Sequence, residues 1–510
     1  MVQAILRGDC ARFVQIHTLI HKMAANRNED GTLKSLPFGG STRGRVSSQA
    51  RKSMMRYCED PDLGLRLITL PSSKNGEHVA VSHPSRGHFE RVLAQLPKDG
   101  ADDRTRSQIV KAVYDTVVGT KGAESKANDK KQEAESRLTK AKEMLAEVEG
   151  EIAAASDAKA KRDLDKKLKK AQQAVERSQL ALHQAGGDVE LDGEQAQAAA
   201  AKAEAGTDQV MILSDHEIDL LVDLTKQSLK ALASGDEKSH HKVVKEVVRV
   251  WKSQHGEEFR SMQLGCGIES AVFGRPVYGG GLFQQSPAAV GASHEIGVHE
   301  QRISYDTFTA IDEYKKDAGE MGAGMLGELP LSKVLFYGYM FIDTRQLIEN
   351  IERSGKDSAI AGEVIRRLIL MASRLSSKTK QGSLAAKNHS LLTLVEVGDE
   401  QPATMEDAFI EAVTIDRDRP NMLVNTFERL ASFIESADGA HPSTNKRAMA
   451  IVDATSKSTL RGVVSTVLDD LSLADWAVRT ANHEAFVAPA STERSASKNG
   501  GSKAASATAE

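Results

Sequence analysis

The sequence is poor in cysteine and has no long apolar run. Its three cysteines, Cys10, Cys58 and Cys266, lie far apart without a Cys-x-x-Cys pair, which excludes a thiolate zinc site and a disulfide framework. No apolar stretch approaches the roughly 20 residues that a membrane-spanning helix needs, and the N-terminus lacks a signal-peptide pattern. We therefore expect a soluble, cytoplasmic protein that does not contact membranes.

The sequence also has few aromatic residues and no excess of one charge. Aromatics make up 4% of the 510 residues, and 67 Lys and Arg against 71 Asp and Glu give a formal net charge of −4. Few aromatics argue against a protein that reads nucleic-acid bases mainly by stacking. The near-neutral balance gives no global attraction to nucleic acid, so any such binding must come from a local patch.

One stretch of the sequence has such a patch. Residues 31–58, GTLKSLPFGGSTRGRVSSQARKSMMRYC, contain no Asp or Glu. They carry six cationic side chains: Lys34, Arg43, Arg45, Arg51, Lys52 and Arg56. The chain therefore concentrates positive charge that no local acid neutralises.

The patch lies between the end of a predicted strand and the first turns of a predicted helix. Near-alternating apolar residues predict a strand over Phe13–Leu19, PFGGSTRG (37–44) predicts a flexible loop, and a Ser cap predicts a helix from Ser48. Lys52 and Arg56 then share a face with the helix N-terminus, whose free N–H groups and dipole favour anions. This arrangement favours a surface for a row of phosphates; the alternative is a solvated basic face. A Walker P-loop is rejected because GGSTRGRV lacks the required Lys-Ser/Thr.

The middle of the chain has a different composition. Residues 121–206 are rich in Ala, Lys, Glu and Gln and contain no aromatic residue. Two apolar seams with 4-3-4-3-4 spacing begin at Ala134 and Leu164, which predicts an antiparallel coiled-coil hairpin.

The remaining segments predict a mixed fold. Short β-rich runs fill 262–344, and a strand is predicted over Leu391–Val397. Helices are predicted over 214–232, 243–254, 357–376 and 404–414. The tail from Ala488 has almost nothing to bury and is expected to be disordered. This order of elements predicts an α+β fold with its helices concentrated in one insertion.

The sequence resembles a known family in six places. FVQIHTLI…NRNEDG…LPFGGSTRGRVSSQARKSMMR is similar to the N-terminal signature of the backbone (CasC-family) subunit of Cascade, the type I-E CRISPR surveillance complex. FGRPVYG, HEIGVHE, YDTFTAIDEY, GAGMLGELPLSKVLFYGYMFID and KTKQGSLAAKNHSLLTLVEV follow in the family's order. The resemblance covers most of the chain outside 121–206 and the tail.

The resemblance implies a hand-shaped α+β protein with an RRM-like (ferredoxin-like) palm, a helical fingers insertion and a β-hairpin thumb. It places the palm at 1–58, 261–300 and 336–487, the fingers at 59–260 including the 121–206 coiled-coil hairpin and linker, the thumb at 301–335 and a disordered tail at 488–510.

The resemblance also implies a function. The family is a non-catalytic RNA-binding scaffold, without cofactor or metal, that oligomerises head to tail along a CRISPR RNA in antiviral defence. It holds the spacer for pairing with target DNA. The implied partners are the CRISPR RNA, the target DNA strand, further copies of the chain, and the large, small, 5′-handle-capping and RNA-processing subunits of Cascade.

Site residues follow from the resemblance together with the charge pattern. The RNA-binding positions are Arg27, Lys34, Arg43, Arg45, Ser47, Gln49, Lys52, Arg56, Arg275 and Pro276. Arg51 is expected to face a neighbouring subunit instead. Pro276 stands where the family commonly has Met, and Thr307 replaces a Trp.

The resemblance assigns a second task to the thumb. The resemblance places Phe308, Thr309 and Leu326 where the family splays out a nucleotide. Such a role is physically sensible, because an apolar wedge can replace the lost base stacking. The alternative is that Phe308 and Leu326 form the core of the hairpin.

Three other features suggest other classes of protein. His17, His21, His294 and His299 invite a metal or acid–base role, but their spacing fits no recognised ligand pattern, and packing in the palm is favoured for His294 and His299. Asp30 invites the alternative of a metal-dependent RNase, because related type III backbone subunits cleave target RNA with an Asp in a comparable loop; capping of a turn is favoured. The 121–206 hairpin offers a protein-interaction module.

Overall fold

The computed structural model describes most of the chain outside a long internal segment and the tail. The described residues are 6, 9–24, 26–69, 78–97, 101–118, 210–233, 240–260, 265–276, 282–283, 285–311, 323–351, 359–376, 381–417, 421–452 and 457–486. The predicted hairpin at 121–206 and the predicted disordered tail at 488–510 lie outside the described residues.

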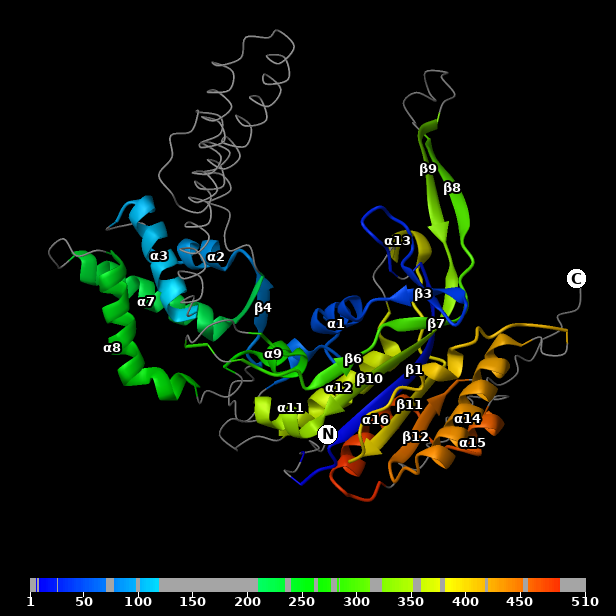
Figure 1. The fold of residues 1–510 in the computed structure, drawn as a ribbon. Helices are drawn as coiled ribbons and strands as arrows, with labels where there is room; N and C mark the ends of the chain where they lie inside the picture. The colour runs from blue at the N-terminus through cyan, green and yellow to red at the C-terminus, as the bar shows by residue number, and fades with distance from the viewer. Residues whose placement is uncertain are drawn as a thin grey trace, which may run out of the picture.

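A nine-stranded sheet forms the centre of the molecule (Figure 1). The strand order is β13-β12-β11-β1-β10-β7-β3-β2, with β6 paired to β10 beside this path. Every pairing is antiparallel except β12–β13. The strands are β1 Phe13–Met23, β2 Ser35–Phe38, β3 Ser41–Val46, β6 Val290–Ala292, β7 Glu295–Glu300, β10 Lys333–Asp343, β11 Leu392–Gly398, β12 Lys446–Ile451 and β13 Thr466–Val467.

β1 lies in the middle of the sheet because apolar side chains on both of its faces are buried. Val14 and Ile16 belong to one hydrophobic cluster and Leu19 to the other, as the two-residue period of a strand requires. The predicted strand Phe13–Leu19 is confirmed, and β1 continues for four residues beyond it.

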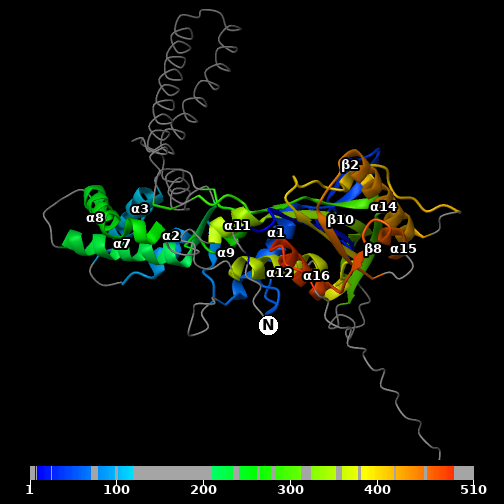
Figure 2. The same ribbon diagram turned by 90° about the horizontal axis from the view of Figure 1, so that it is seen from below.

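Helices cover both faces of this sheet (Figures 1 and 2). One face packs against α9 Ile268–Phe273, α11 Thr344–Ile351, α12 Ala359–Arg374 and α16 Asp470–Ala481. The other packs against the 3₁₀-helix η2 Glu406–Phe409, α14 Met422–Ala440 and α15 Lys457–Arg461. The predicted strand near 391–397 and the predicted helix near 357–376 are confirmed as β11 and α12.

A second hydrophobic core lies in a helical unit that we call the fingers. It contains α2 His88–Ala94, α3 Asp103–Val118, α7 Asp215–Ala233, α8 His240–Arg260 and the ribbon of β4 Ser82–Ser85 with β5 Met211–Ser214. The predicted helices at 214–232 and 243–254 are confirmed as α7 and α8.

Two ion pairs, one buried and one partly exposed, brace the region between the fingers and the sheet. Arg275 Nη1 lies 2.6 Å from Glu217 Oε2, and Arg66 pairs with Glu269. Glu269 also accepts the main-chain N–H of Ser82 at 2.7 Å. Ion pairs and a hydrogen bond to the main chain therefore hold the fingers against the sheet region.

The segment at 37–44 forms a β-hairpin, so the prediction of a flexible loop there is wrong. β2 and β3 pair directly through Gly39 and Gly40, whose φ angles are 57° and 81°, as a two-residue hairpin turn requires. A Cβ atom on Gly39 would lie 1.3 Å from the Ile410 carbonyl oxygen. The two glycines provide a tight turn with a close backbone approach.

The predicted helix at 404–414 is also wrong. The structure has only η2 Glu406–Phe409 there, because the following chain is drawn toward the sheet: the Val413 N–H donates to the Val298 carbonyl at 2.9 Å. The remaining short helices are α1 Ser48–Arg56, η1 Leu65–Leu67 and α13 Gln381–Leu384.

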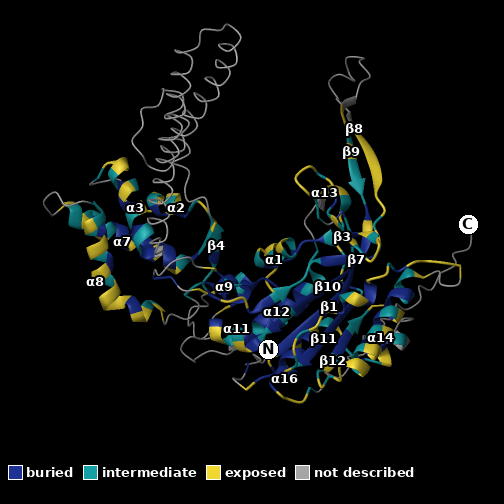
Figure 3. Ribbon diagram, viewed as in Figure 1, coloured by how far each residue is buried: buried dark blue, intermediate teal, exposed yellow. Residues whose placement is uncertain are grey.

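A separate ribbon rises from the sheet (Figure 3). β8 Ser304–Ile311 and β9 Ala323–Leu331 pair antiparallel and lie within the segment that the resemblance assigns to the thumb. We call it the thumb ribbon. None of the helices in the described part of the chain is long and apolar enough to cross a membrane.

A row of paired side chains crosses neighbouring strands of the sheet, buried at His17 and Glu396 and partly exposed at Arg447 and Asp438. His17 Nε2 lies 3.2 Å from Glu396 Oε2, and Arg447 pairs with both Glu396 and Asp438. Burial alone would raise the pKa of Glu396, but His17 and Arg447 hold that pKa at about 2.

Glu396→Gln is expected to lower the free energy of unfolding at pH 7, because it removes the carboxylate that His17 and Arg447 share and leaves Arg447 with Asp438 alone. The folded-state pKa of about 2 lies below the ordinary value of 4.5. The stabilisation is therefore complete above about pH 4.5 and is lost as the pH falls toward 2. Urea unfolding of both proteins between pH 7 and 3 should show a difference that shrinks on acidification; a difference that grows would contradict this account.

Candidate nucleic-acid interface

Helix α1 carries most of the predicted site, and the protein itself provides acceptors for several N–H groups at its N-terminus. Ser47 has extended backbone angles and its hydroxyl accepts the Ala50 N–H at 3.2 Å, which confirms the predicted Ser cap. The Ser48 N–H donates to His294 Nδ1 at 2.9 Å. These bonds take up N–H groups that the sequence pattern had left free for an anion, and they leave the Ser47 side chain a capping role.

The faces of α1 divide its side chains by function. Met55 is buried in the core, and Gln49 and Ser53 are exposed. Lys52 and Arg56 lie partly exposed on one flank, as their spacing of four residues predicts.

Arg51 lies inside the protein, so the expectation that it faces a neighbouring subunit is wrong. It pairs with Glu295 at 3.2 Å and donates to the carbonyls of Ser293 and Tyr339. Lys22 Nζ lies 2.5 Å from the same carboxylate. Burial alone would raise the pKa of Glu295, but Lys22 and Arg51 hold that pKa below its usual value. Glu295 therefore fixes α1 on β1 and β7.

Arg43 is likewise an internal group. Its side chain is 0% exposed, and its guanidinium donates to the carbonyl oxygens of Gly297, Phe409 and Ile410 at 3.0, 3.2 and 3.2 Å. Burial lowers the pKa of Arg43. The charge pattern therefore misassigns it: this arginine ties β3 to β7 and η2.

Two more predicted RNA contacts are engaged elsewhere. Arg275 is 2% exposed and paired with Glu217, whereas Pro276 beside it is exposed. Arg27 donates to the Gly31 carbonyl at 3.1 Å and to the Pro330 carbonyl at 3.0 Å, so it fastens its loop to the thumb ribbon.

Four of the predicted cations remain at the surface: Lys34, Arg45, Lys52 and Arg56, which we call the cation strip. All four are partly exposed, and within the described ranges none pairs with a carboxylate. Partial burial, and then the charges of Arg56 and Arg51, lower the pKa of Lys52. A bound anion would relieve this repulsion.

Main-chain contacts link the elements that carry the strip. The Lys34 carbonyl accepts the Arg45 N–H at 2.9 Å, and the charge of Arg45 acts on His294. His294 contacts Ser48 at the start of α1, and Lys52 follows one helical turn later. The strip therefore runs from the β2–β3 hairpin along α1.

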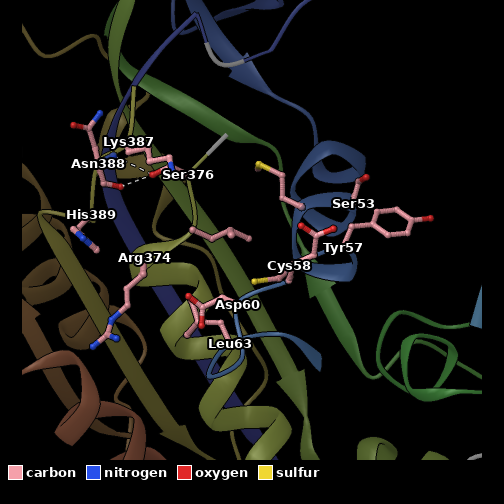
Figure 4. A pocket seen from close by; sticks show the side chains of 13 residues that line it. Ser53, Tyr57, Cys58, Asp60, Leu63, Arg374, Ser376, Lys387, Asn388 and His389 are labelled. Carbon is pink, nitrogen blue, oxygen red and sulfur yellow. Dashed lines mark hydrogen bonds between the residues drawn. The ribbon is translucent and has the colours of Figure 1, made fainter. Parts of the chain in front are cut away.

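A pocket of about 630 Å³ opens beside the opposite flank of α1 (Figure 4). Tyr57 and Asp60 line one wall, and Lys387 and His389 line the wall across from them. Arg374 also lines it but is paired with Asp470. Charges of both signs meet here, so the pocket does not extend the strip.

The thumb ribbon exposes apolar side chains on both of its faces. Phe308 pairs with Gly327 and Thr309 with Leu326, so Phe308 and Leu326 point to opposite faces. Phe308 is 42% and Leu326 71% exposed. The alternative that these two residues form the core of the hairpin is therefore wrong.

Comparison with known proteins assigns the chain to a family. The family model described as CT1975-like protein matches residues 14–194 and 140–475. The chain belongs to the CT1975-like family. No curated protein matches it in sequence.

Two solved structures resemble the fold of this CT1975-like chain. One, described as "CRISPR RNA-guided surveillance complex, pre-nicking", is 19% identical with a TM-score of 0.59, and the match covers 92% of this chain and 100% of that one. Another, described as "CRISPR RNA-guided surveillance complex", is 17% identical with a TM-score of 0.51, over 92% and 99% of the two chains.

Asp30 of this CT1975-like chain lies in a turn. Its carboxylate accepts the Thr32 N–H at 2.9 Å and the Thr32 hydroxyl at 2.6 Å, which confirms the favoured capping role. These hydrogen bonds lower the pKa of Asp30. No group of three or more His, Cys, Asp or Glu that could hold a metal ion occurs among the described residues.

Packing of His294 and His299 in the sheet region is confirmed, and both rings also accept main-chain N–H groups. His299 Nε2 accepts the Leu335 N–H at 3.2 Å, as His294 does that of Ser48. No sequence pattern predicts these bonds, because the partners lie 36 and 246 residues apart along the chain.

Arg43→Gln and Arg45→Gln are expected to behave oppositely. The first leaves buried carbonyl oxygens unpaired and should lower the free energy of unfolding by about 2–4 kcal/mol. The second changes a partly exposed side chain and should stay within about 0.5 kcal/mol. Urea unfolding measures both; equal destabilisation would contradict the internal role of Arg43.

Proposed function

We propose that this CT1975-like chain is a subunit of a CRISPR RNA-guided surveillance complex and binds the sugar–phosphate backbone of the CRISPR RNA along the cation strip. The observation that carries this proposal is the set of partly exposed cations Lys34, Arg45, Lys52 and Arg56, on linked elements and without carboxylate partners in the described structure. The family and the folds of the two complexes support it.

The chemistry of the strip favours backbone binding with little sequence preference. Lys and Arg bind phosphates through charge, which carries no base information. The Arg56 guanidinium lies 5.4 Å from the centre of the Phe273 ring, and this ring is buried, so it is not available to stack on a base. The bases of a bound strand would stay free to pair with target DNA.

We take the sheet as an RRM-like palm. The strands β11-β1-β10-β7 lie side by side and antiparallel. α1 lies in the chain between β1 and β7, together with the β2–β3 hairpin and the fingers, and α12 lies between β10 and β11. With the hairpin and the fingers taken as insertions, this order supports the β-α-β-β-α-β pattern of ferredoxin-like folds. In this proposal, Gln49 and Pro276 are exposed beside the RNA. The thumb ribbon presents Phe308 on one face, and Thr309 with Leu326 on the other, as wedges for an unstacked base.

The proposed subunit is a scaffold without catalysis that assembles head to tail with further copies. Exposed apolar side chains on the thumb ribbon support contact with another molecule, since such surfaces mark interaction sites. Other subunits of the complex and the target DNA strand are the further proposed partners.

Lys52→Gln and Arg56→Gln are each expected to weaken binding of single-stranded RNA similarly for unrelated sequences. Each lost phosphate contact should reduce the slope of log affinity against log salt by about 0.7. Fluorescence anisotropy with two labelled 30-nucleotide RNAs of unrelated sequence, at four salt concentrations, measures both effects.

Lys446→Gln provides the matched control, because Lys446 is an exposed lysine at the start of β12, away from α1. It should leave affinity and slope unchanged. A loss confined to one RNA sequence, or an equal loss in Lys446→Gln, would count against backbone binding by the strip.

Absence of target-RNA cleavage is tested at Asp30. The purified chain, loaded with a guide RNA, is incubated with a labelled complementary RNA and Mg²⁺ or Mn²⁺. We expect no cuts with either wild type or Asp30→Ala, because the Asp30 carboxylate is held in its turn by Thr32. Periodic cuts that disappear in the variant would establish the RNase alternative.

A further inference from the structure

His294 occupies the junction of three elements of the site. It immediately precedes β7, and its Nδ1 atom accepts the Ser48 N–H of α1 at 2.9 Å. A ring nitrogen that accepts an N–H carries no proton, so the proton of the neutral imidazole lies on Nε2. The main chain of α1 thus sets the tautomer of His294.

The surroundings of the ring keep it neutral. Partial burial, and then the charges of Arg45 and Arg51, lower the pKa of His294. The adjacent carboxylate of Glu295 is taken up by Lys22 and Arg51. Protonation would also break the bond from Ser48, because Nδ1 would become a donor.

The second ring nitrogen of His294, Nε2, has no hydrogen-bond partner among the described residues. No described residue accepts a hydrogen bond from His294 Nε2, although the ring is only partly buried. Arg45 lies on one side of it along the cation strip, and Lys52 lies one turn of α1 beyond Ser48. A phosphate bound beside Arg45 at the start of α1 would meet an uncharged N–H donor.

We propose that His294 is a positioning residue for α1 and, through its Nε2–H, a neutral hydrogen-bond donor to an RNA phosphate. This inference rests on the proposed RNA binding and adds a contact of a different kind to it. A cation that binds a phosphate releases counterions, and a neutral donor does not. The contribution of His294 to affinity therefore persists at salt concentrations that weaken Lys52 and Arg56.

Two substitutions separate the two nitrogens. Asn places an amide oxygen near the position of Nδ1, so His294→Asn keeps an acceptor for Ser48 and loses the donor at Nε2. Gln places its amide group near Nε2, so His294→Gln keeps a donor there and loses the acceptor. His441→Asn and His441→Gln are the matched controls, because His441 is exposed at the end of α14 on the other face of the sheet.

The readouts are thermal unfolding and anisotropy with a labelled 30-nucleotide single-stranded RNA across a salt series. His294→Asn should keep its melting temperature within about 2 °C and lose roughly tenfold in affinity at every salt concentration, with the wild-type salt slope. His294→Gln should melt several degrees lower yet lose less affinity than His294→Asn. The His441 variants should match wild type.

Each other outcome is decisive. If His294→Asn binds RNA with wild-type affinity, the proposed phosphate contact is wrong. If the slope of log affinity against log salt is reduced in His294→Asn, the ring binds phosphate as a cation and not as a neutral donor. If the loss of RNA affinity in the two His294 variants parallels their loss of melting temperature, His294 has only a structural role. If wild type itself fails to bind RNA, the proposed function fails rather than this inference.

Discussion

The buried carboxylate of Glu295 is the interaction on which the proposed RNA surface depends. It receives Lys22 from β1 and Arg51 from α1, and all three side chains lie in the interior. Removal of one partner from such a group leaves an uncompensated buried charge, which costs several kcal/mol. The pairing also sets the rotation of α1: with Arg51 turned inward, the 100° step per residue turns Lys52 and Arg56 toward solvent. A charge inside the protein thus determines which charges lie outside.

Local chemistry made part of the structure predictable. A Ser cap followed by a good helix former fixes the start of α1, and apolar side chains on both faces fix β1. The acid-free window correctly indicated the region with unpaired cations. These features depend on residues a few positions apart, so the sequence pattern contains them.

Long-range pairing made the rest unpredictable. Arg43 and Arg45 look equivalent in a strand, yet the register against β7 shifts between them, and the carbonyl partners of Arg43 lie 254 or more residues away. The bond from Ser48 to His294 spans 246 residues. Charge counting cannot distinguish a guanidinium that binds carbonyls inside the fold from one that faces solvent, because both need the same residue type.

The thumb ribbon has a consequence for the isolated chain. It has only two strands, and Leu326 on one face and Phe308 on the other are both in contact with water. If the ribbon folded down onto its own sheet, it would shelter one of these side chains and leave the other wet. Only enclosure from two sides would remove both from solvent, so no single flat contact can bury the apolar side chains of the ribbon.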